Sequence, residues 1–330
     1  MWRLSNLEKY PFYCRKISDQ EWVKRSERRW WPNFVFHYTD IANAINILNS
    51  GMLFSRQDAE KRGLLSVSSG SSAVLAGTNQ LVQSCVRFYF RPQTPTQFHA
   101  EGVRSNNNLS KRYPDAHCPV PVFFLFDSQY VLTLDDCRFS DGGLGSPRAN
   151  YFSTADELIN LPWKKIYHTG RFDPSIEDIT FRRSAEVLVP NNLDLQALRY
   201  IYCRSDAEKE TLLQLLDPRV RAKYRNKIAA TSRSNLFFRK HTFMQTCRLS
   251  SRSAILDFSP ETNSPGPFNL KIEIKTQSQS GIFEKNDFMV MPNQNFSISF
   301  RRAFVKYDIR VHLDNYLVFA NSFEEVDIPF

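Results

Sequence analysis

The stretch Phe34-Val-Phe-His-Tyr-Thr39 is one of three short apolar runs that each carry a chemically useful polar side chain. The other two are Val86-Arg-Phe-Tyr-Phe90, which contains a phenol, and Ser184-Ala-Glu-Val-Leu-Val189, which contains a carboxylate. Short runs rich in Val, Phe and Tyr are typical of strands. A strand alternates its side chains between two faces, so a polar residue flanked by apolar ones is either a buried group with an internal partner or a ligand contact in a cleft.

The residues themselves leave both interpretations open. His37 either bonds a backbone carbonyl in the core or bonds a ribose or a diphosphate, to which Thr39 on the same face would add a hydroxyl. Tyr89 is equally suited to packing. Glu186 can orient a sugar hydroxyl, accept a proton or stabilise an oxocarbenium ion. Ordinary glycoside hydrolysis needs a second carboxylate, and no other strand presents an equivalent one.

Composition restricts the class of protein. A chain of 330 residues with 42% hydrophobic and 14% aromatic residues predicts a globular protein of one large or two smaller domains, not a disordered one. Without a signal-peptide pattern or a long apolar run, we expect a cytoplasmic protein that does not enter the membrane. The six cysteines are widely spaced, which favours free thiols and predicts no metal site.

The net charge of +9 indicates an anionic partner. Eight of the basic residues fall between residues 219 and 240, where there is no Asp or Glu, and this segment is a candidate polyanion contact. Residues 1–30 form a second basic segment, in which Lys and Arg alternate with large rings. These rings either stack on nucleic-acid bases or belong to a terminal helix that docks its Trp side chains on the core.

Residue patterns also predict the organisation of the chain. A helix is expected at 40–51, capped by Thr39 or Asp40 and ended by Gly51, with further helices at 154–161 and from Ser205 to about Pro218. Strands are expected at 121–126 and 128–133, and a Ser/Gly-rich loop at 66–80. Period-two alternation at 269–275, 295–300 and 307–313 predicts an antiparallel β module.

Several short motifs follow one another along the chain in a specific order and spacing. They are Phe36-His-Tyr-Thr39, Asn43, Gly51-Met-Leu53, Arg87-Phe-Tyr-Phe-Arg-Pro-Gln-Thr-Pro95, Phe139-Ser-Asp-Gly142, Leu161-Pro-Trp163, Asp173 and Arg182-Arg-Ser-Ala-Glu-Val-Leu-Val189. Together, over residues 34 to about 216, they resemble the DarT family of nucleic-acid ADP-ribosyltransferases, toxins paired with an antitoxin.

The resemblance implies an α+β fold, an ADP-ribosyltransferase-type split β-sandwich with flanking helices that holds NAD in its cleft. We therefore expect an N-terminal extension at 1–30, the ADP-ribosyltransferase domain at 31–218, a basic linker at 219–244 and the C-terminal antiparallel β module at 245–330. The module lies beyond the compact core of the family.

The resemblance also assigns roles to residues. Glu186 is the expected catalytic residue, which holds the nicotinamide ribose and assists transfer to the acceptor base. NAD is expected as a substrate, with no metal. The expected NAD contacts are His37, Thr39, Asn43, Tyr89 and an arginine that is either Arg56 or Arg62. The expected nucleic-acid contacts are Gln93, Thr94, Arg182, Arg183, Arg221, Lys223, Arg225 and Lys227.

Two departures from the family leave the acceptor open. Gln93-Thr94 stands where the family often has Arg-Ser or Arg-Thr, and the segment between Gly51 and Tyr89 is unlike that of other members. The resemblance favours a base in single-stranded DNA, with RNA as the competitor. The alternatives are a catalytically inactive single-strand-binding module and an enzyme that modifies protein. The resemblance further implies an antitoxin partner within a toxin-antitoxin or phage-defence system, and exposed edges of the β module could dock that antitoxin or a chaperone.

Overall fold

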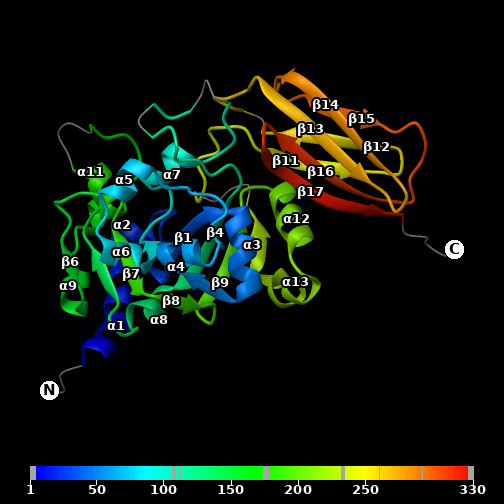
Figure 1. The fold of residues 1–330 in the computed structure, drawn as a ribbon. Coiled ribbons are helices and arrows are strands. Elements are labelled where there is room, and N and C mark those ends of the chain that lie inside the picture. Colours follow the sequence, from blue (N-terminus) through cyan, green and yellow to red (C-terminus); the bar gives the residue numbers. More distant parts are fainter. Residues whose placement is uncertain are drawn as a thin grey trace.

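The centre of the molecule is a sheet in the order β10-β9-β4-β1-β3-β7-β5-β6 (Figure 1). The computed structural model describes residues 5–105, 109–111, 113–173, 178–231, 235–259, 261–291 and 293–325. Neighbouring strands of this sheet are antiparallel except β9 and β10, which are parallel. The strands are β1 (Phe34–Asp40), β3 (Cys85–Tyr89), β4 (Pro121–Asp127), β5 (Arg138–Ser140), β6 (Tyr151–Phe152), β7 (Glu186–Pro190), β9 (Leu198–Cys203) and β10 (Ile228–Ala230).

The ladder between β1 and β3 is the weak point of this sheet. The whole of β1 pairs with β4, whereas only Phe36 and Tyr89 are in register between β1 and β3. The expected mixture of helices and antiparallel strands is therefore present. The strands form one hydrogen-bonded sheet with a nearly interrupted ladder, and a split sandwich stays an interpretation of this geometry.

Local capping explains why the predicted helices form where they do. In α3 (Ile41–Ser50) the carboxylate of Asp40 accepts a hydrogen bond from the Ala42 N–H, and Gly51 follows at φ 70°. The helices α9 (Ala155–Ile159) and α12 (Asp206–Leu215) begin at the predicted positions, each with a hydroxyl residue at its N-cap. These three predictions are confirmed.

The prediction of a strand at 128–133 is wrong. Residues Ser128–Leu132 form the helix α8, because the carboxylate of Asp127 accepts hydrogen bonds from the N–H groups of Gln129 and Tyr130 and so caps a helical turn. The preceding strand is confirmed as β4. The segment predicted as a loop at 66–80 contains the helix α5 (Ser72–Ala76).

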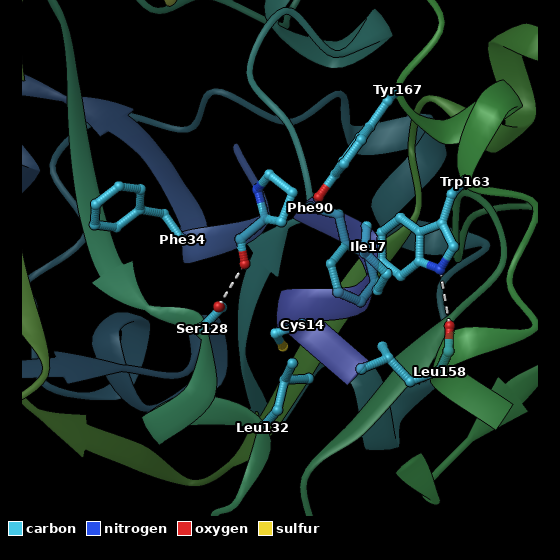
Figure 2. A pocket seen from close by; sticks show the side chains of 10 residues that line it. Cys14, Ile17, Phe34, Phe90, Ser128, Leu132, Leu158, Trp163 and Tyr167 are labelled. Atoms are coloured by element: carbon cyan, nitrogen blue, oxygen red, sulfur yellow. Dashed lines mark hydrogen bonds between the residues drawn. The ribbon is translucent and has the colours of Figure 1, made fainter. Parts of the chain in front are cut away.

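The N-terminal segment packs on the core, as the second interpretation predicts. Trp31 is buried, and the helix α1 (Asn6–Ser18) places Cys14 and Ile17 against Trp163 and Tyr167 (Figure 2). The indole of Trp163 donates to the Leu158 carbonyl at 2.9 Å. The space left between these side chains is about 10 Å³, no more than one water molecule needs, and is a packing void and not a ligand site.

The predicted C-terminal β module is present as two antiparallel sheets, in the orders β11-β12-β15 and β14-β13-β16-β17 (Figure 1). Each of the three period-two runs forms a strand, at β13, β15 and β16. The strands are β11 (Met244–Leu249), β12 (Ser253–Phe258), β13 (Phe268–Lys275), β14 (Ser280–Phe288), β15 (Asn295–Ser299), β16 (Lys306–Leu313) and β17 (Tyr316–Glu324).

The helix α12 joins this module to the central sheet. Its Thr211 hydroxyl donates to the Ala207 carbonyl at 2.8 Å and accepts from the Ala320 N–H of β17 at 3.0 Å. Its Leu212 and Phe319 of β17 belong to one continuous apolar core. The module is therefore packed on the rest of the chain through buried contacts.

The remaining elements cover the faces and edges of these sheets (Figure 1). Within the described residues, no helix is both long and apolar enough to cross a bilayer. The elements are α2 (Glu21–Lys24), η1 (Trp31–Asn33), β2 (Met52–Phe54), α4 (Arg56–Lys61), α6 (Gln80–Gln83), α7 (Pro95–Ala100), α10 (Trp163–Ile166), α11 (Ile179–Arg182), β8 (Asn192–Asp194), α13 (Pro218–Tyr224) and η3 (Arg225–Lys227).

Replacing Thr211 with Val should destabilise the protein by about 1 to 3 kcal/mol, because the buried N–H of Ala320 would lose its acceptor while the shape is kept. Urea unfolding measures this change. The matched control is Thr133→Val, since that hydroxyl also donates to the carbonyl four residues earlier, on a part-buried turn. Equal costs for the two variants would show that the contact between α12 and β17 contributes no stability.

Candidate active site

An ion pair between Glu186 and Arg87 forms the centre of the candidate site. Glu186 opens β7, is 2% exposed, and lies beside β3 in the register that pairs it with Tyr89. The Arg87 guanidinium binds both of its oxygens, Nε to Oε2 at 2.7 Å and Nη2 to Oε1 at 2.9 Å. Burial lowers the pKa of Arg87, but the charge of Glu186 outweighs this effect and leaves the pKa above its ordinary value.

The glycine-rich segment after β5 encloses the carboxylate. The Leu144 N–H donates to Oε1 of Glu186 at 3.2 Å, and the Glu186 N–H donates to the Ser140 hydroxyl at 3.0 Å. A Cβ on Gly142 would lie 2.2 Å from the Phe181 ring, so only glycine allows this close approach. The segment therefore fixes the carboxylate from the side opposite to β3.

Two tyrosines complete this group. Burial and the negative charge of Glu186 raise the pKa of Tyr89, and the same two causes raise the pKa of Tyr151. Tyr151 lies on β6, is 42% exposed, and is placed by its pairing with Ser140. The site thus contains an ion pair whose carboxylate is buried and whose guanidinium is partly exposed, with two phenols beside it, one of them open to solvent.

The sequence reasoning missed Arg87 and Tyr151 as site residues. A signal for Arg87 exists, since it is two residues before Tyr89 and must share its face in a strand. No comparable signal exists for Tyr151, because β6 has two residues and is located by pairing alone.

His37 has the surroundings of a core histidine. Its Nδ1 lies 3.0 Å from the Arg87 carbonyl, and its ring packs edge-on against Phe88 and Phe124. Burial lowers its pKa to about 4, so the ring is neutral at neutral pH. Alternation along β1, combined with the pair of Phe36 and Tyr89, puts His37 on the face opposite Glu186. The two residues are connected through the backbone of Arg87 and do not face each other.

Asn43 and Thr39 lie in a second polar group next to His37. The Asn43 amide donates to the Thr39 hydroxyl at 3.1 Å and to the Val67 carbonyl at 2.7 Å, and its oxygen accepts from the N–H groups of Ser66 and Val67. Both side chains are buried. Asn43 therefore holds the segment after α4 against α3, and a direct contact of Asn43 with NAD stays a prediction.

The two candidate arginines differ in position. Arg56 forms an ion pair with Glu60 at 2.8 Å and donates to the Ser68 hydroxyl, next to the segment that Asn43 holds. Arg62 stacks on the Phe54 ring, 4.7 Å from its centroid. Of the two, Arg56 is the one that the structure brings to the Thr39 group.

The predicted acceptor residues are largely used in internal contacts. Thr94 is buried and caps α7, whereas Gln93 adopts φ 56° and donates to the Phe237 carbonyl at 3.3 Å. Arg182 pairs with Asp141 and Asp178, and Arg183 donates to Gly170 and contacts His168. A surface hollow of about 320 Å³ beside Arg182 is also lined by Asp141 and Glu157, which makes it unfavourable for an anion.

The first part of the basic segment, residues 219–230, lies far from Glu186. The strand β10 at its end is five strand positions away from β7, about 24 Å across the sheet. Arg221 donates to the carbonyls of Gln214 and Leu216, and Lys227 to that of Leu198. Lys223 lies over the Tyr224 ring and Arg225 is exposed, while Arg233 lies outside the described residues.

Within the described part of the chain, no group of three His, Cys, Asp or Glu side chains could hold a metal ion. A family model described as "ssDNA thymidine ADP-ribosyltransferase, DarT" matches residues 36–238, more than half of the chain. This chain belongs to the DarT family.

Solved DarT structures are distantly similar. Thermus sp. 2.9 DarT in complex with ADP-ribosylated ssDNA is 18% identical, with a TM-score of 0.49, over 63% of this chain and 97% of that chain. The complex of Thermus sp. 2.9 DarT with NAD+ is 18% identical, with a TM-score of 0.47, over 63% and 98%. Thermosipho africanus DarTG in complex with ADP-ribose is 15% identical, with a TM-score of 0.46, over 62% and 51%. No curated protein matches the chain.

Replacing Arg87 with Met should lower the free energy of unfolding by about 3 kcal/mol, because it leaves the carboxylate of Glu186 buried without its counter-charge. In a double-mutant cycle by urea unfolding, adding Glu186→Gln should recover part of that loss. The control cycle is Lys306→Met with Glu324→Gln, an exposed pair at 2.7 Å whose coupling should be below about 1 kcal/mol. Equal coupling in the two cycles would contradict the structural importance of the buried pair.

The partly buried His37 should make stability depend on pH. Its pKa is about 4 in the folded chain against an ordinary 6.5, so the unfolded chain binds the extra proton first as pH falls. The stability that comes from keeping His37 neutral is fully present above pH 6.5 and is lost as pH falls toward 4. Between pH of about 7 and about 4, His37→Gln should therefore lose about 1 to 3 kcal/mol less stability than the parent. Parallel pH curves in urea unfolding would show that His37 titrates normally.

Proposed function

We propose that this protein is an NAD+-dependent ADP-ribosyltransferase that modifies a base in single-stranded DNA. The observation that carries the proposal is the match of the DarT family model over residues 36–238, a range that contains Glu186, Arg87 and Tyr151. The family description names thymidine in ssDNA as the acceptor, and thymidine is the base we propose. NAD+ is the proposed ADP-ribose donor, in line with the Thermus sp. 2.9 DarT complex.

The reaction requires a group that responds to developing positive charge. The bond between the ribose C1′ and the nicotinamide nitrogen breaks with its electron pair leaving on nicotinamide, and C1′ becomes cationic. The positive charge thus moves from the nicotinamide ring to the ribose, and a carboxylate beside C1′ stabilises this state more than the ground state. A ring nitrogen of the base then forms the new bond to C1′ and releases its proton. Glu186 is the side chain we assign to both tasks.

The contacts of Glu186 fit the second task. Each carboxylate oxygen can accept two hydrogen bonds. Oε1 accepts from Arg87 and Leu144, whereas the contact described for Oε2 is with Arg87 Nε alone. Oε2 therefore keeps an acceptor position for a proton from the base, and Arg87 holds the carboxylate in one orientation while this happens.

The remaining assignments concern the donor site and the acceptor base. We propose that the donor site includes Thr39 and Arg56, which are linked to residues 66–68 through Asn43 and Ser68, and His37, which contacts the Arg87 carbonyl. We also propose that Tyr89 and Tyr151 border the reacting ribose and the acceptor base. Because Gln93 lies at the turn into α7, it is the proposed contact that distinguishes acceptors.

The test is transfer of label from NAD+ to oligonucleotides. The parent protein should label a single-stranded DNA oligonucleotide that contains thymidine, and Glu186→Gln should lower the rate by at least about 10²-fold, because a positioned acid-base group contributes that much or more. The matched control is Glu324→Gln, a carboxylate of the C-terminal module that should retain the parental rate.

Other labelling results would overturn parts of the proposal. Label on RNA alone would reassign the polymer, label on DNA without thymidine would reassign the base, and label on added protein alone would reassign the acceptor class. No label on any acceptor, with NAD+ intact, would favour a binding module.

We further propose that the enzyme acts as the toxin of a toxin-antitoxin pair, so that expression of the parent, but not of Glu186→Gln, arrests growth.

A further inference from the structure

An exposed aromatic and basic surface lies on and beside α7. Phe98, which is 41% exposed, meets Phe238 edge-on at 5.3 Å between centroids and His99 at 5.4 Å. Lys240 lies over the Phe98 ring, 4.4 Å from its centroid, and His99 meets Tyr113 at 5.0 Å. We call these five residues the α7 platform. Of its rings Phe98 is exposed, and Phe238, His99 and Tyr113 are half-buried. Accessible aromatic rings next to a cation are the elements with which proteins bind unpaired nucleotides.

The platform is held in place from below. The Glu101 carboxylate, at the end of α7, accepts from the N–H groups of Phe238 and Arg239 at 3.0 and 2.8 Å. The Gln97 amide donates to the Leu236 carbonyl at 2.7 Å and to Glu101 at 2.8 Å. These buried bonds fix the segment 236–240 against α7, so the rings are presented without an ordering cost on binding.

The platform is connected to the candidate site. Thr96, two residues before Phe98, lies within hydrogen-bonding reach of the Tyr89 phenol, and Tyr89 is in register with Glu186. The Gln93 amide bonds Phe237, next to Phe238. A strand whose acceptor base lies at Glu186 therefore has the platform within reach of its neighbouring nucleotides.

Lys240, the last cation of the basic segment, is better placed than the cations at residues 219–227. Lys240 is exposed, and the nearby carboxylate, Glu101, is 2% exposed and occupied by backbone N–H groups. By contrast, the strand β10, which follows residues 219–227, is about 24 Å from β7 across the sheet, and Arg221 and Lys227 already bind carbonyls.

We propose that nucleotides flanking the acceptor base stack on Phe98 and Phe238 of the α7 platform, and that Lys240 moves from the Phe98 ring to a phosphate. This inference rests on the proposed function, since it takes single-stranded DNA as the substrate. It assigns the DNA track to α7 and residues 238–240 and not to residues 219–227.

The test measures binding separately from catalysis. In the Glu186→Gln background, fluorescence anisotropy with a labelled thymidine-containing single-stranded DNA gives the dissociation constant. Phe98→Leu, which keeps apolar bulk but loses the ring, should weaken binding about five- to 150-fold, because stacking of a base on an aromatic side chain is worth that factor. Phe98→Trp should bind as well as the parent or better.

The chain offers a close control. Phe12 of α1 is 45% exposed and carries Lys16 over its ring at 5.6 Å, the same chemistry on another element. Phe12→Leu should leave the dissociation constant unchanged. Lys240→Gln should lower the slope of log affinity against log salt by about 1, as expected for one lost phosphate contact.

Each outcome decides the question. Unchanged binding in Phe98→Leu, or an equal loss in Phe12→Leu, would overturn the platform. Weakened binding by Phe98→Leu in a protein that labels no oligonucleotide would retain the platform and reject the proposed transfer reaction. Labelling of DNA by the parent with no effect of Phe98→Leu on binding would retain the reaction and reject the platform.

Discussion

The buried ion pair between Arg87 and Glu186 is the constraint on which the rest of the site depends. A carboxylate that is 2% exposed needs a counter-charge with good geometry, and Arg87 supplies one from the adjacent strand through two hydrogen bonds. The same carboxylate receives the Leu144 N–H, so β3, β7 and the glycine-rich segment are fixed relative to one another. A carboxylate held in this way is oriented before any substrate arrives, which is what electrostatic stabilisation of a charged transition state requires.

The nearly interrupted ladder beside this pair gives the site its second part. Where β1 and β3 cease to pair, the His37 ring bonds the Arg87 carbonyl in place of a strand partner. Arg87 therefore connects the two polar groups, its side chain to Glu186 and its carbonyl to His37. The Asn43 amide, which bonds Thr39, also bonds the Val67 carbonyl, and Arg56 donates to the neighbouring Ser68 hydroxyl.

The sequence predicted what depends on local pattern. Short apolar runs located β1, β3 and β7, period-two runs located β13, β15 and β16 of the C-terminal module, and capping residues located α3, α9 and α12. The strand predicted at 128–133 was wrong because one carboxylate, Asp127, outweighed a β-prone composition. Glu186 could be selected from its setting and from family resemblance, but its partner Arg87 follows from strand register, and Tyr151 from the pairing of a two-residue strand. The count of charges predicted a nucleic-acid contact at 219–240. Only the side-chain hydrogen bonds in the structure distinguish cations that bind internal carbonyls from those that face solvent.

The position of α12 has a consequence for how such a protein can evolve. One side of this helix faces the central sheet, and the other receives the Ala320 N–H on the Thr211 hydroxyl and shares a core with Phe319. The boundary of the family model at residue 238 is therefore not a seam in the folded molecule. The strand β17 covers one face of α12 and excludes water from it. A recombination event that replaced the C-terminal sheets with another module would therefore have to supply a surface that covers the same face of the helix. Because they share this packed interface, we expect the region matched by the family model and the C-terminal sheets to be inherited together, whatever each contributes to activity.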